Sequence, residues 1–379
     1  MENLQTRRHL IKSMGSGLLA YGIFGPGPAS AQSGESGTYA KQALEVTDYI
    51  HKNFWNKKSD LYAVAIDKQE PDHIWGAGVM FSALVGAARH DPRYKSIMRK
   101  FYDGLDSYWD AKVKIPGYEP SPTGGGGNDK YYDDNAWMVI MFVEAYEMTG
   151  ESRYLKRANE TLDFVMSGWD EEAGGGIWWH ERHEGGGKNT CANAPAAVGC
   201  FRISKFSDAK SAPKRIADGG KIVKWTTKNL RGGNGLFGDA INVATGVVNG
   251  GQLTYNSALM LRAYICLYAC TGEDLYLDEA KQMGVAAKAF LGGNGAYRDS
   301  IKWSHLMVEA DLELYRWTNE EYLLNRAKTD CDVHFAGWKL NPPKDLITNA
   351  GLARQLWLLA DTETAAGRDF WKKSDRLRK

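Results

Sequence analysis

Two adjacent carboxylic acids, Asp133 and Asp134, are the residues of this sequence whose types and spacing best suit catalysis. They directly precede Ala136–Met148, an almost wholly apolar stretch that is typical of a helix buried on most sides. The dipole and the free N–H groups at a helix N-terminus stabilise an ionised carboxylate. A neighbouring carboxyl group that faces this charge in a partly buried cleft has a raised pKa and keeps its proton. One ionised and one protonated carboxyl group is the combination that cleavage of a glycosidic bond requires.

Segments rich in glycine and aromatic residues surround this pair, at Gly124–Gly127, Gly174–Gly176 and Gly185–Gly187. Glycine allows a backbone to turn sharply or to approach a ligand closely. Aromatic rings such as those of Trp178 and Trp179 offer flat apolar faces against which a pyranose ring can stack. The glycine runs fit neither a dinucleotide fingerprint nor a Walker loop, so nucleotide binding is not expected.

An internal repeat reveals how the pair is positioned. Thr149–Glu151 and Thr271–Glu273 are the same Thr-Gly-Glu turn at an offset of 122 residues, and residues around both turns also match. The repeating unit is about 60 residues long and consists of an apolar helix, a glycine-stopped turn, an amphipathic helix and a glycine-rich loop. This pattern predicts an inner and an outer layer of helices.

The repeat predicts an all-α (α/α)6 barrel, a toroid of six helical hairpins, spanning residues 32–379 as one catalytic domain. An outer helix at Tyr39–Phe54 would pack beside the last inner helix and close the ring. An open α-solenoid is the alternative, but long loops at one end of every inner helix favour a closed ring with a cleft at that end. Gly176–His180 is the best candidate for a short strand. Inner helices are predicted to start near Trp75, Asp134, Asn193, Asn256, His305 and Asn349.

Polar residues at these helix starts would converge on the cleft. Asp and Asn are also preferred N-cap residues, so a purely structural role for Asn256 and Asn349 remains equally open. That explanation is weaker for Asp133 and Asp134, because one cap needs one oxygen and a second adjacent carboxylate adds repulsion.

Residues 1–31 have the features of a twin-arginine-type signal peptide. Thr6–Lys12 contains two arginines, Met14–Phe24 is apolar and Ala29–Ala31 offers a small-residue cleavage pattern. A basic first helix is the alternative. Removal of this segment would change the net charge from +1 to −1. We therefore expect an exported protein, in the periplasm or the medium.

Composition and motifs exclude several classes of function. The 379 residues contain 47 Lys and Arg against 46 Asp and Glu, which argues against a nucleic-acid or membrane-surface protein. No apolar run reaches the roughly 18–20 residues that span a bilayer. His180 and His183 form a lone H-x-x-H, so a metal site is not expected. A bond between Cys191 and Cys200 is an open possibility in this chain of five cysteines, and we expect a monomer.

Four motifs occur in order along the chain: Tyr131–Trp137, Gly174–Trp179, Lys188–Asn189 with Ala192–Ala194, and Leu253–Asn256. Together they resemble the consecutive motifs of glycoside hydrolase family 76, which comprises endo-α-1,6-mannanases with an (α/α)6 fold and related fungal wall transglycosylases. The resemblance implies a retaining mechanism without metal or cofactor, with Asp133 as the nucleophile and Asp134 as the acid/base.

The resemblance also implies an α-mannan or mannooligosaccharide substrate. The chain departs from the family pattern at Met138, where a second Trp often stands, at Pro195, and over Tyr297–His305. These departures leave the linkage and the acceptor preference open. The residues expected to hold the sugar are Tyr132, Asn135, Trp178, Trp179, Asn193, Tyr255 and Asn256.

Three other functions remain as alternatives. A transglycosylase would use the same intermediate with a sugar hydroxyl as acceptor. A glycan-binding protein would keep the barrel without catalysis, although the retained Asp pair argues against it. An (α/α)6 enzyme acting on acidic sugars would need a basic site, for which Arg182 and Arg202 are the candidates.

Overall fold

Nearly continuous apolar stretches form the inner helices of the computed structural model, which describes residues 37–183 and 186–375. Their side chains are buried on all sides because neighbouring helices cover every face. The predicted signal peptide lies outside the described residues. The inner helices are α2 (Ile74–His90), α4 (Tyr132–Thr149), α6 (Thr190–Ser204), α8 (Thr254–Thr271), α10 (Ile301–Thr318) and α12 (Leu346–Glu363).

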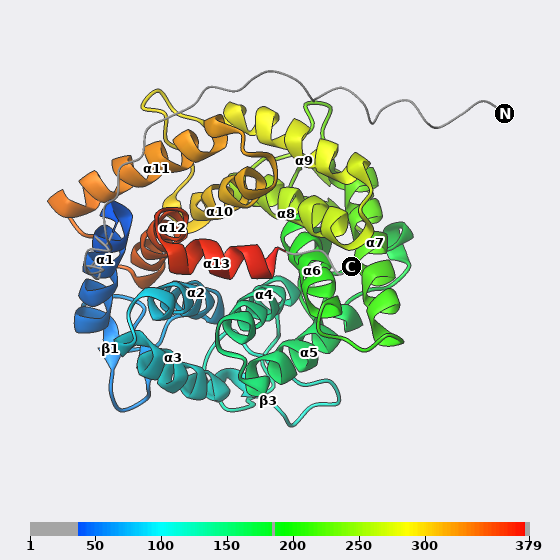
Figure 1. Ribbon diagram of the computed structural model, residues 1–379. Coiled ribbons are helices and arrows are strands. Elements are labelled where there is room, and N and C mark those ends of the chain that lie inside the picture. The colour runs from blue at the N-terminus through cyan, green and yellow to red at the C-terminus, as the bar shows by residue number, and fades with distance from the viewer. Residues whose placement is uncertain (1–36, 184–185, 376–379) are drawn as a thin grey trace, which may run out of the picture. The chain divides into compact units, whose positions relative to one another are not determined.

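Amphipathic stretches form the outer helices, each with an apolar face against an inner helix and a polar face toward solvent. Five of them pack on the inner helix that precedes them in the chain, and α1 packs on α12 (Figure 1). The outer helices are α1 (Thr38–Phe54), α3 (Arg93–Gly104), α5 (Ser152–Ser167), α7 (Ser211–Leu230), α9 (Asp274–Ala286) and α11 (Glu321–Leu340).

The inner helices form a closed ring. Each contacts the next along the chain, and α12 returns to contact α2 (Figure 1). The all-α prediction is confirmed, and every inner helix begins within four residues of its predicted start. Because all six run in the same direction through the ring, their N-terminal ends gather at one end of it.

The predicted glycine stops are present at equivalent places in the repeat. Helices α4 and α8 both end at a glycine in the left-handed conformation, Gly150 and Gly272, each with φ of 72°. The backbone N–H of each glycine donates to the carbonyl of the tyrosine four residues earlier. In α10 the left-handed residue is Asn319.

Strands are short and lie in the loops. The described strands pair antiparallel as β1 (Trp55–Asn56) with β2 (Leu61–Tyr62), β3 (Trp109–Asp110) with β4 (Gly117–Tyr118), and β5 (Gly187–Asn189) with β6 (Ala240–Asn242) and then β7 (Val248–Asn249). Short 3-10 turns complete the loops, η1 (Leu105–Tyr108), η2 (Glu172–Gly174) and η3 (Ala287–Phe290).

The strand predicted at Gly176–His180 is wrong. Ile177 and His180 make only isolated bridges, to Trp169 and Tyr131 respectively. Three consecutive glycines at positive φ, Gly174–Gly176, turn the chain where this segment begins, so it continues as a loop rather than along a neighbouring strand.

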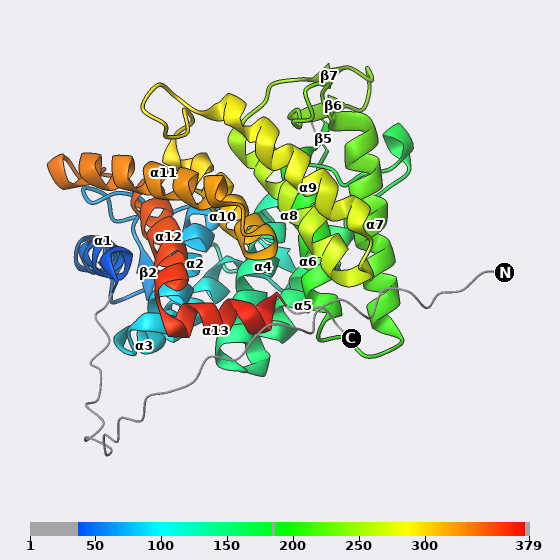
Figure 2. The same ribbon diagram turned by 45° about the horizontal axis from the view of Figure 1, so that its top comes forward.

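A last helix, α13 (Ala365–Ser374), crosses the end of the ring that lies opposite to β5–β7 (Figure 2). Trp371 of this helix donates its indole N–H to Asp361 of α12 at 2.7 Å. Among the described helices, none combines the length and the apolar character needed to span a membrane.

Buried charges fill the ring near this closed end. Glu144 of α4 bonds to Arg354 of α12 at 2.6 Å and to Arg89 of α2 at 2.7 Å. Arg354 also bonds to Glu309 of α10, and Arg89 to Asp361. These cations hold the pKa of the Glu144 carboxyl well below its usual range despite burial. The network ties four inner helices together.

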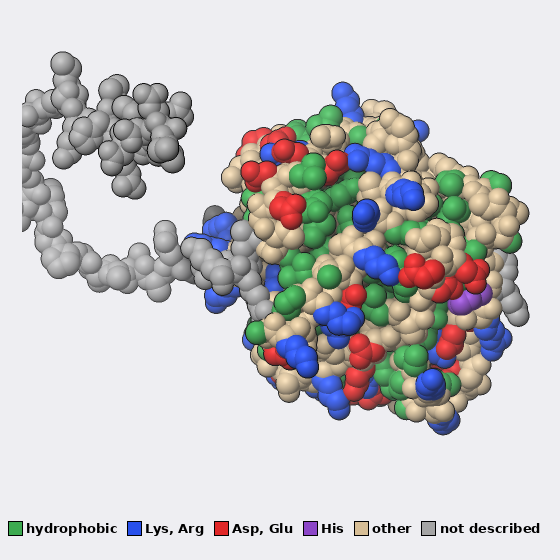
Figure 3. All heavy atoms as spheres, turned by 90° about the vertical axis from the view of Figure 1, so that its right-hand side faces the viewer, with side chains coloured by type: hydrophobic (Ala, Val, Ile, Leu, Met, Phe, Trp, Pro, Cys, Tyr) green, Lys and Arg blue, Asp and Glu red, His purple; other side chains and the backbone are tan. Residues whose placement is uncertain are grey.

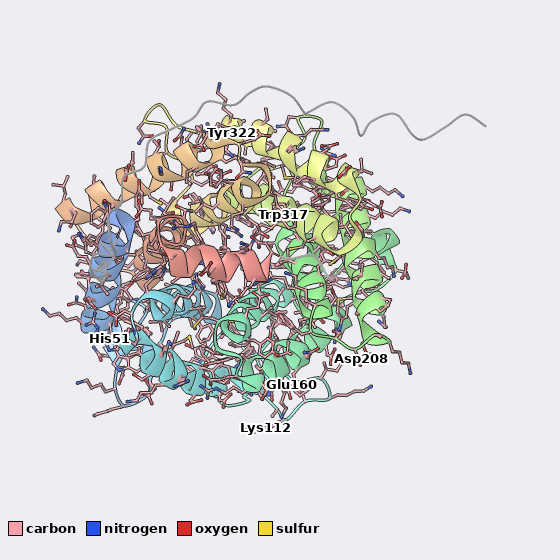
Figure 4. All side chains as sticks on the ribbon, viewed as in Figure 1. His51, Lys112, Glu160, Asp208, Trp317 and Tyr322 are labelled. Carbon is pink, nitrogen blue, oxygen red and sulfur yellow. The ribbon has the colours of Figure 1, made fainter. Side chains whose placement is uncertain are left out.

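Loss of one partner from this network should be costly, because it leaves buried charges without compensation. We expect Glu144→Gln to lower the free energy of unfolding by about 3–5 kcal/mol, measured by denaturant or thermal unfolding. Glu160→Gln is the matched control, since Glu160 lies at the periphery on α5 (Figure 4) and its side chain is 41% exposed. A change under about 1 kcal/mol is expected there. Equal effects of the two substitutions would contradict this account.

The Cys191–Cys200 bond that the sequence left open is absent, and none of the five cysteines forms a disulfide. Both residues lie in α6, nine positions apart, which is about 13 Å along a helix and beyond the reach of a disulfide.

On the face shown in Figure 3, basic and acidic side chains lie interspersed, in keeping with the near-zero net charge.

Candidate active site

A cavity of about 460 Å³ opens where the N-terminal ends of the inner helices meet. Its wall is predominantly aromatic and its polar groups are few, which suits a ligand with flat apolar faces and a reactive bond. The aromatic side chains come from α2, α4, α8, α10 and the loops between them: Trp75, Tyr131, Trp137, Trp179, Tyr255 and Trp303. Asp133 and Asp134 lie in the same cavity, in the first turn of α4.

The Asp133 carboxylate accepts hydrogen bonds from three donors. The backbone N–H of Asp134 donates to its Oδ1 at 2.9 Å. The indole N–H of Trp179 donates to Oδ2 at 2.9 Å, and the Cys191 thiol donates to the same oxygen at 3.4 Å. Burial raises the pKa of Asp133, and these donors oppose the rise because they stabilise the charged form.

Asp134 has no hydrogen-bond partner for its carboxyl group among the described residues. Burial raises its pKa well above the usual carboxyl range, and the adjacent Asp133 charge raises it further. The two neighbours therefore differ in their preferred state, with Asp133 the better stabilised as a carboxylate and Asp134 as the protonated acid. Such a pair can supply a nucleophile and a proton donor to the same bond.

A buried lysine, Lys188, holds the loop that carries Trp179 through hydrogen bonds to the residues that precede it. The Lys188 ammonium bonds to the Asp170 carboxylate at 2.5 Å and to the carbonyls of Glu172 and Gly175 at 2.7 and 2.8 Å. Asp170 in turn accepts the indole N–H of Trp178 at 2.6 Å. Lys188 thus fixes the segment that brings Trp179 to Asp133.

The predicted sugar-binding residues separate into two groups. Trp179 and Tyr255 line the cavity, and 41% of the surface of Trp179 stays exposed. Tyr132 and Trp178 do not line it, because each is packed away from the opening. Tyr132 stacks on Phe164 at 4.9 Å between α4 and α5, and Trp178, 6% exposed, stacks on His183 at 4.2 Å.

The asparagines at the helix starts are also placed outside the cavity. Asn135 bonds to the backbone N–H and C=O of Tyr118. Asn193 bonds in the same way to the N–H and C=O of Ile177. In these two repeats the amide pins the preceding loop onto the inner helix. Asn256 is fully buried, and its amide has no partner in the described structure.

Several residues of the cavity were not predicted as site residues, among them His73, Trp75, Trp303 and Cys191. Trp75 and Trp303 stand in the first turns of α2 and α10, so the repeat itself offered a signal for them. Neither His73 nor Cys191 belongs to a pattern that indicates chemistry. Within the described residues, no group of three or more His, Cys, Asp and Glu side chains is arranged to hold a metal ion.

Residues 39–329, more than half of the chain, match the family model described as glycosyl hydrolase family 76. No protein with a curated description matches the sequence.

Solved structures share the fold at low sequence identity. A GH76 α-mannanase of Bacteroides thetaiotaomicron is 23% identical with a TM-score of 0.81, over 86% of this chain and 96% of that one. An α-1,6-mannanase of Salegentibacter sp. HEL1_6, in complex with α-1,6-mannotriose, is 18% identical with a TM-score of 0.72, over 85% and 99%. Dfg5 of Chaetomium thermophilum, in complex with glucosamine, is 13% identical with a TM-score of 0.68, over 85% and 89%.

Proposed function

The chain belongs to glycosyl hydrolase family 76 and is a glycoside hydrolase, and we propose that it cleaves α-1,6-mannosidic bonds of a mannan with retention of configuration. The observation that carries this proposal is the asymmetry of the Asp pair, with three donors on Asp133 and none on Asp134, inside an aromatic cavity. The Salegentibacter complex supports it, because the inactive enzyme that binds α-1,6-mannotriose carries asparagine in place of two consecutive aspartates.

In the first step, an Asp133 oxygen attacks the anomeric carbon of the mannosyl unit. The bond from that carbon to the bridging oxygen breaks, and the leaving oxygen takes the proton from the Asp134 carboxyl group. The products are a mannosyl ester of Asp133, an ionised Asp134 and a shortened glycan with a free hydroxyl.

In the second step, Asp134 takes a proton from a water molecule, whose oxygen attacks the same carbon. The ester bond to Asp133 breaks and its electron pair returns to the carboxylate. Both aspartates thereby regain their starting states. The Trp179 indole and the Asp134 backbone N–H hold Asp133 throughout, while Trp179 and Tyr255 offer faces for the sugar ring.

The raised pKa values predict the pH dependence of kcat/KM. Activity should fall below the pKa of Asp133, because its protonated form cannot attack, and above the pKa of Asp134, because its ionised form cannot donate a proton. Burial raises both pKa values. We therefore expect a bell-shaped profile of kcat/KM against pH, in which the apparent pKa values of both limbs lie above the ordinary carboxyl pKa of about 4. A rate profile measured from pH 3 to 10 checks this. A maximum below pH 4 would contradict it.

The segment that departs from the family pattern, Tyr297–His305, reaches the cavity. Trp303 lines the wall, with its ring 6.5 Å from that of Tyr255. A sugar bound beside Asp133 would meet this wall, so the departure can alter which linkage and which acceptor fit. We propose hydrolysis rather than transfer to a sugar hydroxyl, because a water molecule needs no acceptor subsite in the cavity.

The remaining alternatives fit the site less well. A binding protein would have no need of two adjacent carboxyl groups with opposed protonation preferences. For acidic sugars, Arg202 is unsuitable because it is buried against Glu147 in the interior, and Arg182 is not in the cavity wall.

We further propose that the closed helical ring is the (α/α)6 barrel, that residues 32–379 form one catalytic domain, and that the protein is exported as a monomer.

Incubation with linear α-1,6-mannan, followed by chromatography over time, tests the proposed function. A ladder of mannooligosaccharides indicates an endo-acting hydrolase. Products longer than a defined starting oligosaccharide indicate transglycosylation. Unchanged mannan, together with binding that survives Asp133→Asn, would overturn the proposal in favour of a glycan-binding role.

A further inference from the structure

One hydrogen bond to the Asp pair has no part in the steps above. The thiol of Cys191, the second residue of α6, donates to Oδ2 of Asp133 at 3.4 Å, the same oxygen that accepts from Trp179. Cys191 also lines the cavity, with 8% of its surface exposed. A thiol beside a partly buried carboxylate is therefore part of the environment that decides whether this carboxylate is charged.

We propose that Cys191 is a positioning residue of the reaction, whose thiol hydrogen bond helps keep Asp133 ionised and oriented for attack. This inference rests on the proposed function, since it concerns the nucleophile assigned there. Two donors on Oδ2 and one on Oδ1 leave Asp133 with a fixed set of partners, while Asp134 has none. Removing one donor reduces the difference between the two carboxyl groups.

The charged surroundings of Cys191 keep it a donor. Burial raises the pKa of the thiol well above its usual value, and the charges of Asp133, Asp239 and Asp134 raise it further. The protonated thiol therefore persists across the pH range in which the pair titrates. The other titratable groups at the cavity are His73, Tyr131 and Tyr255, whose ring OH lies 3.5 Å from Asp239.

Neighbouring cysteines do not share this setting. Cys200 lies on the same helix, fully buried, with its sulfur 3.8 Å from that of Met166 on α5. It touches no residue of the Asp pair. Cys200→Val is therefore a matched control for Cys191→Val, because both replace a buried thiol of α6 with a side chain of similar size.

The test compares Cys191→Val, which removes the donor, with Cys191→Ser, which retains one, and with Cys200→Val. The first readout is the acid limb of the kcat/KM profile on an α-1,6-mannooligosaccharide. We expect Cys191→Val to raise the apparent pKa of this limb by about one unit, since a hydrogen bond to the charged form is lost. Cys191→Ser and Cys200→Val should keep the wild-type limb.

The second readout is the carboxyl titration of Asp133 in the ligand-free protein, followed by carbon-13 NMR and assigned with Asp133→Asn. It should show the same upward shift in Cys191→Val alone. An unchanged Asp133 titration in Cys191→Val, or an equal shift in Cys191→Ser, would overturn the proposal. Because this readout needs no substrate, it decides the role of Cys191 even if the wild-type protein fails to cleave mannan, an outcome that would overturn only the proposed function.

Discussion

Asp133→Asn is expected to abolish turnover of an α-1,6-linked mannooligosaccharide, lowering kcat by about 10⁴-fold or more. The amide has nearly the shape of the carboxylate, but it cannot form the ester through which the retaining reaction passes. Trp179 and Cys191 would still find an oxygen to bond, so the cavity should keep its form. The measurement is the rate of release of reducing ends under saturating substrate.

Two controls make this result specific. Circular dichroism and the thermal midpoint establish that the variant is folded. Asp208→Asn changes the same group at an exposed site before α7 (Figure 4), on a residue that does not line the cavity, and should leave turnover unchanged. Turnover of Asp133→Asn at the wild-type rate would show that Asp133 is not the nucleophile.

Asp134→Asn is expected to lower kcat by about 10²–10⁴-fold, the usual contribution of a positioned general acid. The loss should depend on the leaving group, which gives this variant a signature of its own. An aryl mannoside whose phenolate leaves without protonation should form the Asp133 ester at close to the wild-type rate. Hydrolysis of this ester should then be slow, because no base remains to activate water, and the phenol should appear in a burst.

Stopped-flow or rapid-quench detection of the phenol measures that burst. The same loss for the aryl mannoside as for the natural linkage, with no burst, would contradict the acid/base role of Asp134. Turnover of both substrates at the wild-type rate would remove Asp134 from the mechanism altogether.

The repeat allowed most of the architecture to be predicted from the sequence. The Thr-Gly-Glu turn at Gly150 and its equivalent at Gly272 specify helix ends by local backbone chemistry, and local chemistry is legible in sequence. Helical period then placed the inner and outer layers. The Gly176–His180 segment was mistaken for a strand because apolar and aromatic residues occur both in strands and in loops that pack on the core. Contacts with residues distant in the chain decide between the two, and the local sequence does not show them.

The charge network could not be predicted in the same way. Glu144 and Arg354 occur singly within apolar helices, and their partners come from helices distant in sequence. Their positions mark only an interruption of an apolar pattern. The pairing depends on closure of the ring, which brings α12 against α2 and leaves α4 within reach of both.

The candidate site was predictable in its centre and not in its periphery. The Asp pair stands out because two carboxyl groups precede an apolar helix, whereas the distinction between Trp178 and Trp179 depends on how Lys188 and Asp170 hold their loop. The helix-start asparagines were assigned to sugar binding on position alone. Asn135 and Asn193 instead satisfy buried backbone groups, a role that amides fill in many folds.

The central claim is retaining cleavage of an α-1,6-mannosidic bond by Asp133 and Asp134, and the stereochemistry of the first product tests it most directly. A linear α-1,6-mannooligosaccharide is mixed with the protein, and the anomeric protons are followed by NMR before mutarotation. The account predicts that the α-anomer forms first and that Asp133→Asn yields no product. First appearance of the β-anomer would show direct attack by water and contradict the covalent role assigned to Asp133.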